Sequence, residues 1–176
     1  MWTDRDIDRF FNYHLRKAEK RILVFLQRAG EEFVKIARKE GNYQDWTGNL
    51  RSSIGYVIAK DGHIVDFSSF DKVRGAGDNM AIVRFTTKDG KTVNFKAKGR
   101  SGNGEDGPKA GFQLAVQLVS EFTTGYVLIC VAGMKYAAYV EAMENKDVIT
   151  SATETTEDWI KKQSKVLFDK LTEKGY

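Results

Sequence analysis

Few side chains in this sequence are suited to nucleophilic or general acid–base catalysis. A Ser-His-Asp or Cys-His site must include one of its two histidines, and His14 and His63 lie far apart in the chain with no catalytic motif around either. The single cysteine, Cys130, lies in the apolar run 126–132, where a thiol behaves as a small buried hydrophobic group. We therefore expect no catalytic residues and interpret the chain as a non-enzyme.

Residues that bind metals are also sparse. One cysteine and two histidines without close spacing do not match a zinc site, and no acidic run has the spacing of a calcium loop. Scattered carboxylates such as Asp66, Asp71 and Glu141 leave open a metal-dependent hydrolase. We rank that hypothesis last, because nothing in the sequence brings these side chains together. We expect neither a metal nor a cofactor.

One glycine pattern matches a nucleotide-binding motif. Residues 102–107 read Gly-Asn-Gly-Glu-Asp-Gly and satisfy G-x-G-x-x-G. A dinucleotide site also requires a preceding buried parallel strand and amides directed at a pyrophosphate. Here Glu105 and Asp106 would place negative charge beside the phosphates, and residues 96–100 do not have the pattern of a buried strand. A flexible surface loop is the better interpretation.

Basic residues gather in two places, one near the N-terminus and one near residue 95. The two groups are Arg16, Lys17, Lys20 and Arg21, and Lys91, Lys96, Lys98 and Arg100. Such groups can neutralise phosphates in a salt-dependent manner, so a nucleic-acid-binding module is the alternative function. The overall charge is mild, because 24 acidic residues offset 28 basic ones, and solvated surfaces explain both groups more simply.

Nothing in the sequence indicates a membrane protein or a disulfide scaffold. One cysteine cannot form an internal disulfide. No stretch approaches the roughly 20 apolar residues of a membrane span, and the N-terminus has no apolar signal core. We expect a protein that is made in the cytoplasm and has no membrane partner.

The apolar spacing near the N-terminus predicts one long helix over residues 4–40, because hydrophobic residues recur at every third or fourth position. Thr3 and Asp6 predict a capping box at its start, and Gly41-Asn42 predicts a left-handed stop. Such a helix is longer than a compact domain can cover, so we expect part of it to project or to pack on a neighbour. Its phenylalanines are expected to pack in the core: Phe10, Phe11, Phe25 and Phe33.

Two β-hairpins are predicted after this helix. The first joins residues 55–59 to residues 63–67 through Asp61-Gly62, a strong turn signal. The second joins residues 81–85 to residues 92–95.

The glycine-rich residues 99–107 offer no apolar side chain to bury and predict a mobile loop. Residues 112–119 predict a short helix, with a buried strand as the alternative. Residues 126–131 are rich in β-branched and aromatic residues and predict a central strand. Residues 136–143 predict one or two helical turns.

A final helix is predicted from Ser151, with Glu154 as its capping partner, to about Glu173. The chain is therefore expected to form a single α+β domain over residues 1–176. In it, the long N-terminal helix and the C-terminal helix pack on a small, mainly antiparallel sheet.

Two short segments carry a family resemblance. They are residues 45–56, Asp-Trp-Thr-Gly-Asn-Leu-Arg-Ser-Ser-Ile-Gly-Tyr, and residues 133–141, Gly-Met-Lys-Tyr-Ala-Ala-Tyr-Val-Glu. In the first, we expect Leu50 and Ile54 to face the core and Arg51 to be exposed. With the long helix before them, these segments resemble the tail-completion, or head–tail joining, proteins of long-tailed bacteriophages.

The resemblance covers residues 1–60 and 126–173. Residues 70–110, with the second hairpin and the glycine-rich loop, look like an insertion relative to the family. Ala142-Met143 also departs from the aromatic residue and glycine that are common there.

The resemblance implies a non-enzymatic virion protein that forms a ring, commonly of six copies, between the head connector in the neck and the tail tube. Its partners would be further copies of itself, head-connector proteins and tail-tube proteins. DNA contact by the basic hairpin and the first helix is the alternative.

Overall fold

The computed structural model describes residues 3–75, 80–86, 90–98, 102–143 and 146–172. These residues form an α+β fold, as the sequence predicts. The elements in chain order are α1 (Asp4–Glu40), α2 (Asn49–Ser52), β1 (Ile54–Lys60), β2 (His63–Phe67), β3 (Met80–Thr86), β4 (Thr92–Lys98), α3 (Asp106–Val119), β5 (Tyr126–Ala132), α4 (Ala137–Glu141) and α5 (Thr150–Thr172).

Helix α1 has the predicted bounds and start. The Thr3 hydroxyl accepts from the Asp6 amide at 3.3 Å, while the Asp6 carboxylate accepts from the Thr3 amide at 3.0 Å. The predicted left-handed stop is wrong, because Gly41 has a φ of −54°. Its carbonyl instead accepts from the Arg51 guanidinium at 3.1 Å, so this orphan helix-end acceptor is satisfied by a side chain.

A three-stranded antiparallel sheet has the order β2-β1-β5. β1 and β2 meet at the predicted turn, where Asp61 and Gly62 both have positive φ, at 51° and 79°, as the common two-residue hairpin requires. The prediction that residues 126–131 form the central strand is wrong. β1 is central and almost wholly buried, whereas β5 lies at an edge of the sheet.

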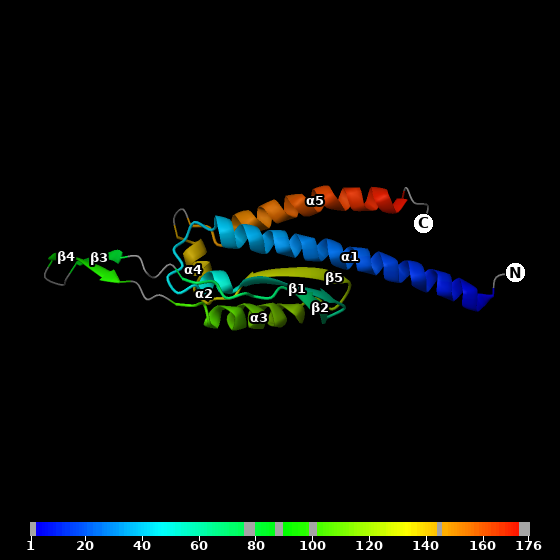
Figure 1. Ribbon diagram of the computed structural model, residues 1–176, viewed down its shortest axis with the longest axis horizontal. Helices are drawn as coiled ribbons and strands as arrows, with labels where there is room; N and C mark the ends of the chain where they lie inside the picture. The colour runs from blue at the N-terminus through cyan, green and yellow to red at the C-terminus, as the bar shows by residue number, and fades with distance from the viewer. Residues whose placement is uncertain (1–2, 76–79, 87–89, 99–101, 144–145, 173–176) are drawn as a thin grey trace.

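Helices cover both faces of this sheet, so the body has three layers, with α1 and α5 on one side and α3 on the other (Figure 1). Side chains of β1 alternate between the two cores. Ile54, Tyr56 and Ile58 pack with residues of α1, whereas Val57 and Ala59 pack with residues of α3.

The last three helices follow the sequence predictions closely. α3 includes the residues for which a helix was favoured over a strand, α4 is the predicted short turn, and α5 has nearly the predicted bounds. α5 starts beside the main core, where Ala152 is buried. It then continues along α1, where the rings of Phe25 and Trp159 stack with centroids 5.5 Å apart.

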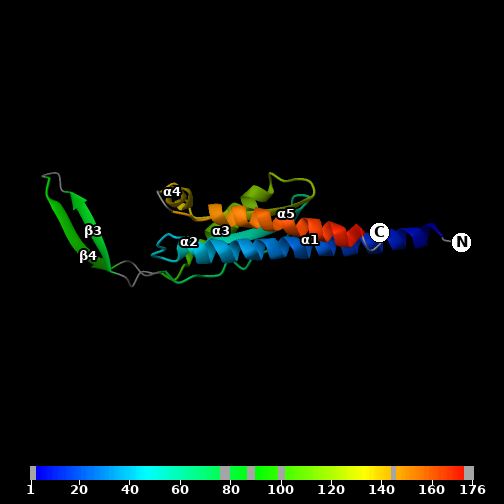
Figure 2. The same ribbon diagram turned by 90° about the horizontal axis from the view of Figure 1, so that it is seen from above.

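Strands β3 and β4 form a separate two-stranded sheet, in which Met80 pairs with Lys98 and Thr86 with Thr92. Both views show this hairpin at the end of the molecule opposite the N-terminus, beyond the three-layer body (Figures 1 and 2). The segment that leaves the body is shorter than the predicted insertion 70–110. Phe70 is a core residue, and α3 already begins at Asp106.

Candidate assembly surface

The first family-like segment is organised by a buried carboxylate. Asp45 accepts from the Gly48 amide at 2.9 Å and from the Arg51 amide at 2.7 Å, which holds the start of α2. Gly48 has a φ of 79°, a backbone conformation that favours glycine. Leu50 and Ile54 are buried in the core, as predicted.

The prediction that Arg51 is exposed is wrong. Its guanidinium donates to the carbonyls of Gly41 and Tyr43 at 3.1 and 3.4 Å and lies 5.0 Å from the centre of the Tyr43 ring. Helical spacing places Leu50 on the core side but does not predict these contacts. The partners of Arg51 lie in the segment before α2, at Gly41 and Tyr43, and not in α2 itself. Arg51 therefore joins the end of α1 to α2.

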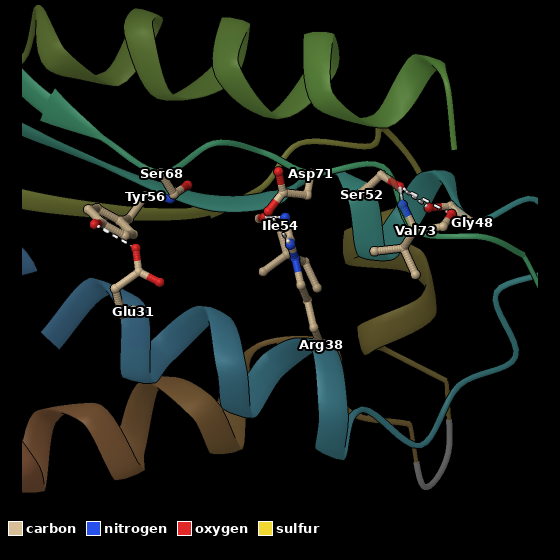
Figure 3. Close-up of polar contacts among 9 residues, drawn as sticks. All are labelled: Glu31, Arg38, Gly48, Ser52, Ile54, Tyr56, Ser68, Asp71 and Val73. Atoms are coloured by element: carbon tan, nitrogen blue, oxygen red, sulfur yellow. Dashed lines mark hydrogen bonds and ion pairs between the residues drawn. The ribbon is translucent and has the colours of Figure 1, made fainter. Parts of the chain in front are cut away.

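Hydrogen bonds hold residues 68–75 against α2 and β1 (Figure 3). The Ser52 hydroxyl donates to the Gly48 carbonyl at 2.6 Å and accepts from the Val73 amide at 2.7 Å. The Ser68 hydroxyl accepts from the Tyr56 amide at 3.0 Å. Both serines are buried, so water does not reach their hydroxyl groups, and these hydrogen bonds satisfy them instead.

Two side chains of α1 also reach this layer (Figure 3). Arg38 donates to the Ile54 carbonyl at 2.8 Å and lies 3.9 Å from the Asp71 carboxylate. The Tyr56 hydroxyl donates to Glu31 at 2.9 Å. Burial, followed by this bond to Glu31, raises the pKa of Tyr56. These contacts fix α1 on the sheet.

The second family-like segment contains a residue whose role the sequence did not reveal. The Glu141 carboxylate accepts from the amides of Val148, Ile149 and Thr150 at 2.7, 3.1 and 3.1 Å, and it also bonds the Thr150 hydroxyl. The start of α5 is thus capped by a distant carboxylate. The predicted cap formed by Ser151 and Glu154 is wrong, because α5 begins at Thr150 and the Ser151 amide donates to the Asp147 carboxylate at 3.2 Å.

The two family-like segments meet in the fold. β1 pairs with β5 from Ile54↔Ala132 to Lys60↔Tyr126, and the Gly133 amide donates to the Ser53 carbonyl at 3.2 Å. Ala137 is buried beyond this junction, while Tyr136 and Tyr139 of the same segment remain exposed.

The glycine motif packs against α2. The Gly104 amide donates to the Thr47 carbonyl at 3.0 Å, and the Gly75 amide donates to the Gly102 carbonyl at 2.9 Å. A Cβ on Gly104 would lie 2.6 Å from the Val73 carbonyl oxygen. Residues 102–107 therefore do not match the expected flexible loop, because backbone packing replaces the missing apolar side chains. Residues 99–101 of that prediction lie outside the described residues.

The carboxylates considered for a metal site serve three separate places. Asp66 accepts from Gln27 at 2.8 Å, Asp71 faces Arg38, and Glu141 caps α5. Within the described ranges, no three His, Cys, Asp or Glu side chains gather as metal ligands would.

The histidines and the cysteine also lie in different parts of the fold. His14 lies near the N-terminal end of α1 with its ring 4.3 Å from that of Phe10, and His63 is exposed at the start of β2. Cys130 lies on β5, where burial raises the pKa of its thiol to about 12. This is the hydrophobic role that the sequence predicts.

The N-terminal segment of α1, residues 4–15, exposes several large apolar side chains. It reaches beyond the sheet and α3 (Figure 1). Ile7, Phe11, Tyr13 and Leu15 are 41%, 60%, 61% and 59% exposed. The prediction that Phe10 and Phe11 pack in the core is therefore wrong, since the helix outruns the sheet that would cover them. Phe33 is buried and Phe25 stacks on α5, as expected.

The basic groups fall on different surfaces. Lys17, Lys20 and Arg21 line a groove between α1 and α5. Lys91 is exposed beside the start of β4. Lys96 and Lys98 belong to β4, and Arg100 lies outside the described residues.

The described helices include none that is long and apolar enough to cross a membrane. Comparison of the chain with protein-family models, with curated proteins and with solved structures finds no match in any of the three.

Proposed function

We propose that this protein is a non-enzymatic structural subunit of a long-tailed phage virion, made in the host cytoplasm and assembled into a ring at the head–tail junction. The observation that carries this proposal is the exposed apolar N-terminal segment of α1. Burying the remaining surface of Phe11, Tyr13 or Leu15 against a neighbour contributes about 1 kcal/mol each. Exposed apolar patches of this kind mark protein–protein contacts.

The position at the neck rests on the resemblance of residues 45–56 and 133–141 to tail-completion proteins. Support comes from how these segments are used here. They meet where the Gly133 amide donates to the Ser53 carbonyl, and their polar side chains hold α2 and the start of α5 in place. Asp45, Arg51 and Glu141 have structural partners, which suits a scaffold whose function lies in contacts with head-connector proteins, tail-tube proteins and further copies of itself.

The test is assembly of the full chain, alone and mixed with the head-connector and tail-tube proteins encoded beside it. Light scattering and electron microscopy should detect rings. Phe11→Ser should reduce ring formation at least tenfold, because it removes apolar surface from the contact. Phe122→Ser is the matched control, since Phe122 is 43% exposed on the connection between α3 and β5. Rings that form equally well with Phe11→Ser, or no rings in any mixture, would refute the proposal.

A second candidate is a nucleic-acid-binding module. Three residues of the basic N-terminal group, Lys17, Lys20 and Arg21, gather along one groove, and such residues can follow a phosphate backbone. Titrating a fluorescent DNA duplex at several salt concentrations tests it. This function requires an affinity that falls steeply as salt rises, and flat or absent binding at low salt removes it.

A further inference from the structure

The groove between α1 and α5 is lined by basic side chains, which we call its rim, and by apolar side chains, which we call its floor. It has a volume of about 730 Å³. Its basic lining residues are Lys17, Lys20, Arg21 and Arg28, its apolar lining residues are Val24, Phe25, Trp159, Val166 and Leu167, and Gln163 completes the set. Among the described residues, no acidic side chain is part of this lining. A second hollow on the other side of Arg28 differs, because Glu31 and Glu32 balance Arg28 and Lys35 there.

The shape of the groove suits a helix. Its lining on α1 runs from Lys17 to Arg28, about 17 Å at 1.5 Å per residue, which equals about three helical turns. Val166 is 41% exposed, so the floor offers apolar surface to an occupant.

We propose that this groove binds an acidic amphipathic helix of a partner protein. The apolar face of that helix would pack on Val24, Trp159 and Val166, and its carboxylates would meet the basic rim. This surface is distinct from residues 4–15 of α1, so the inference does not depend on the ring proposed above.

Charge argues against a second copy of the chain, and the apolar lining argues against a single-stranded nucleic acid. A second copy bound through the same groove would bring four basic side chains against four more, and such like-charge contacts oppose association. A single-stranded nucleic acid would satisfy the basic rim, but its bases would need an aromatic platform. Trp159 already stacks on Phe25 at an interplanar angle of 24°, and Val24, Val166 and Leu167 offer bases no stacking surface.

The test uses the full chain and three fluorescent probes: an 18-residue helical peptide of Leu and Glu with one apolar face, the same peptide with Lys in place of Glu, and a single-stranded oligonucleotide. Fluorescence anisotropy should show binding of the Glu peptide and not of the Lys peptide. Lys20→Glu with Arg28→Glu should weaken binding of the Glu peptide at least tenfold, about the effect of reversing two close charges.

Two comparisons make the result specific. Lys109→Glu with Lys135→Glu changes the net charge equally at exposed positions outside the groove and should alter binding less than twofold. Val166→Asn should weaken binding of the Glu peptide severalfold, because it places a polar group on the apolar floor. It should leave any binding of the oligonucleotide unchanged.

Three outcomes would overturn the inference. The first is a dissociation constant for the Glu peptide weaker than about 1 mM. The second is an oligonucleotide that binds more tightly than the Glu peptide and is released by Lys20→Glu with Arg28→Glu. The third is self-association of the chain, measured by sedimentation, that this double variant abolishes.

Discussion

At the scale of single residues, the main finding is that polar side chains connect elements which the sequence pattern treats as independent. Asp45 and Arg51 tie the end of α1 to α2, and Glu141 ties α4 to α5. Each forms contacts with backbone groups that a helix end or a loop would otherwise leave unpaired. Substitutions at these positions should affect folding rather than a chemical reaction.

Glu141→Ala should lower the free energy of unfolding by about 1–3 kcal/mol, because the first amide of α5 and the two amides just before it lose their acceptor. Urea denaturation followed by circular dichroism measures this change. Glu154→Ala is the matched control and should cost less than about 0.5 kcal/mol, since Glu154 is exposed. Equal losses in the two variants would contradict the capping role of Glu141.

Tyr43 should make the fold sensitive to alkali. Burial raises the pKa of this phenol to about 12 from the ordinary value of 10.0. Below pH 10 the Tyr43 phenol is neutral in both the folded and the unfolded chain, so its contribution to stability is fully present. Between about pH 10 and pH 12 the unfolded chain ionises while the folded chain does not, so roughly 2 kcal/mol of stability is lost.

Tyr43→Phe should reduce that alkaline loss and change stability at pH 7 by less than about 1 kcal/mol. Tyr139→Phe is the control, because Tyr139 is 72% exposed. Urea denaturation at a series of pH values tests both variants. If Tyr43→Phe loses as much stability above pH 10 as the unaltered chain, Tyr43 does not cause the effect.

At the scale of elements, packing of the glycine motif on α2 is the feature that the sequence concealed. The sequence shows a polar, glycine-rich stretch and favours a mobile loop. In the fold, the lack of side chains lets the backbone of Gly104 approach Thr47, Ser52 and Val73. A glycine-rich pattern does not distinguish a solvated loop from close backbone packing, because both exclude large side chains.

Gly104→Ala should destabilise the protein by about 2–4 kcal/mol, combining a left-handed conformation with a steric clash. Gly90→Ala provides the comparison. Gly90 also has positive φ, 76° against 70° for Gly104, but a Cβ there meets no described atom within 4 Å. Gly90→Ala should lower the free energy of unfolding by only about 1 kcal/mol. Similar losses at both positions, measured by thermal unfolding, would show that residues 102–107 do not pack as described.

At the scale of the whole molecule, the protein is a three-layer body with extensions at its two ends (Figures 1 and 2). One end carries the exposed segment of α1 and the other carries the β3–β4 hairpin. Residues 4–15 of α1 are not among the described residues that form the two buried cores. Surfaces that stand apart from a core are suited to contacts with other subunits, and they should be removable without unfolding the body.

Replacing residues 76–101 by Gly-Gly should leave the free energy of unfolding within about 1 kcal/mol of the original, since a short turn costs little closure entropy. The two ends already meet, with the Gly75 amide 2.9 Å from the Gly102 carbonyl oxygen. Deleting residues 99–107 is the contrasting variant. It removes Gly104 and the start of α3 and should destabilise the body strongly, contrary to the expectation from a mobile loop. Unfolding by the first deletion, or tolerance of the second, would contradict this division.

Local patterns in the sequence determined most of the elements. The apolar spacing, the Thr3–Asp6 cap and the Asp61-Gly62 turn identified α1 and the first hairpin, because each depends on residues a few positions apart. The burial of Leu50 and Ile54 followed from the same spacing. These interactions are local, so a single sequence is sufficient to predict them.

The strand order, the capping of α5 by Glu141, the contacts of Arg51 and the groove between α1 and α5 all depend on contacts between separate segments of the chain, so they became visible only in the folded structure. β5 is more apolar than an edge strand needs to be, because α1 and α3 pack on its faces. The exposed apolar segment of α1 is another such case. Its spacing is that of a core helix, and only the end of the sheet beneath it determines which turns are covered.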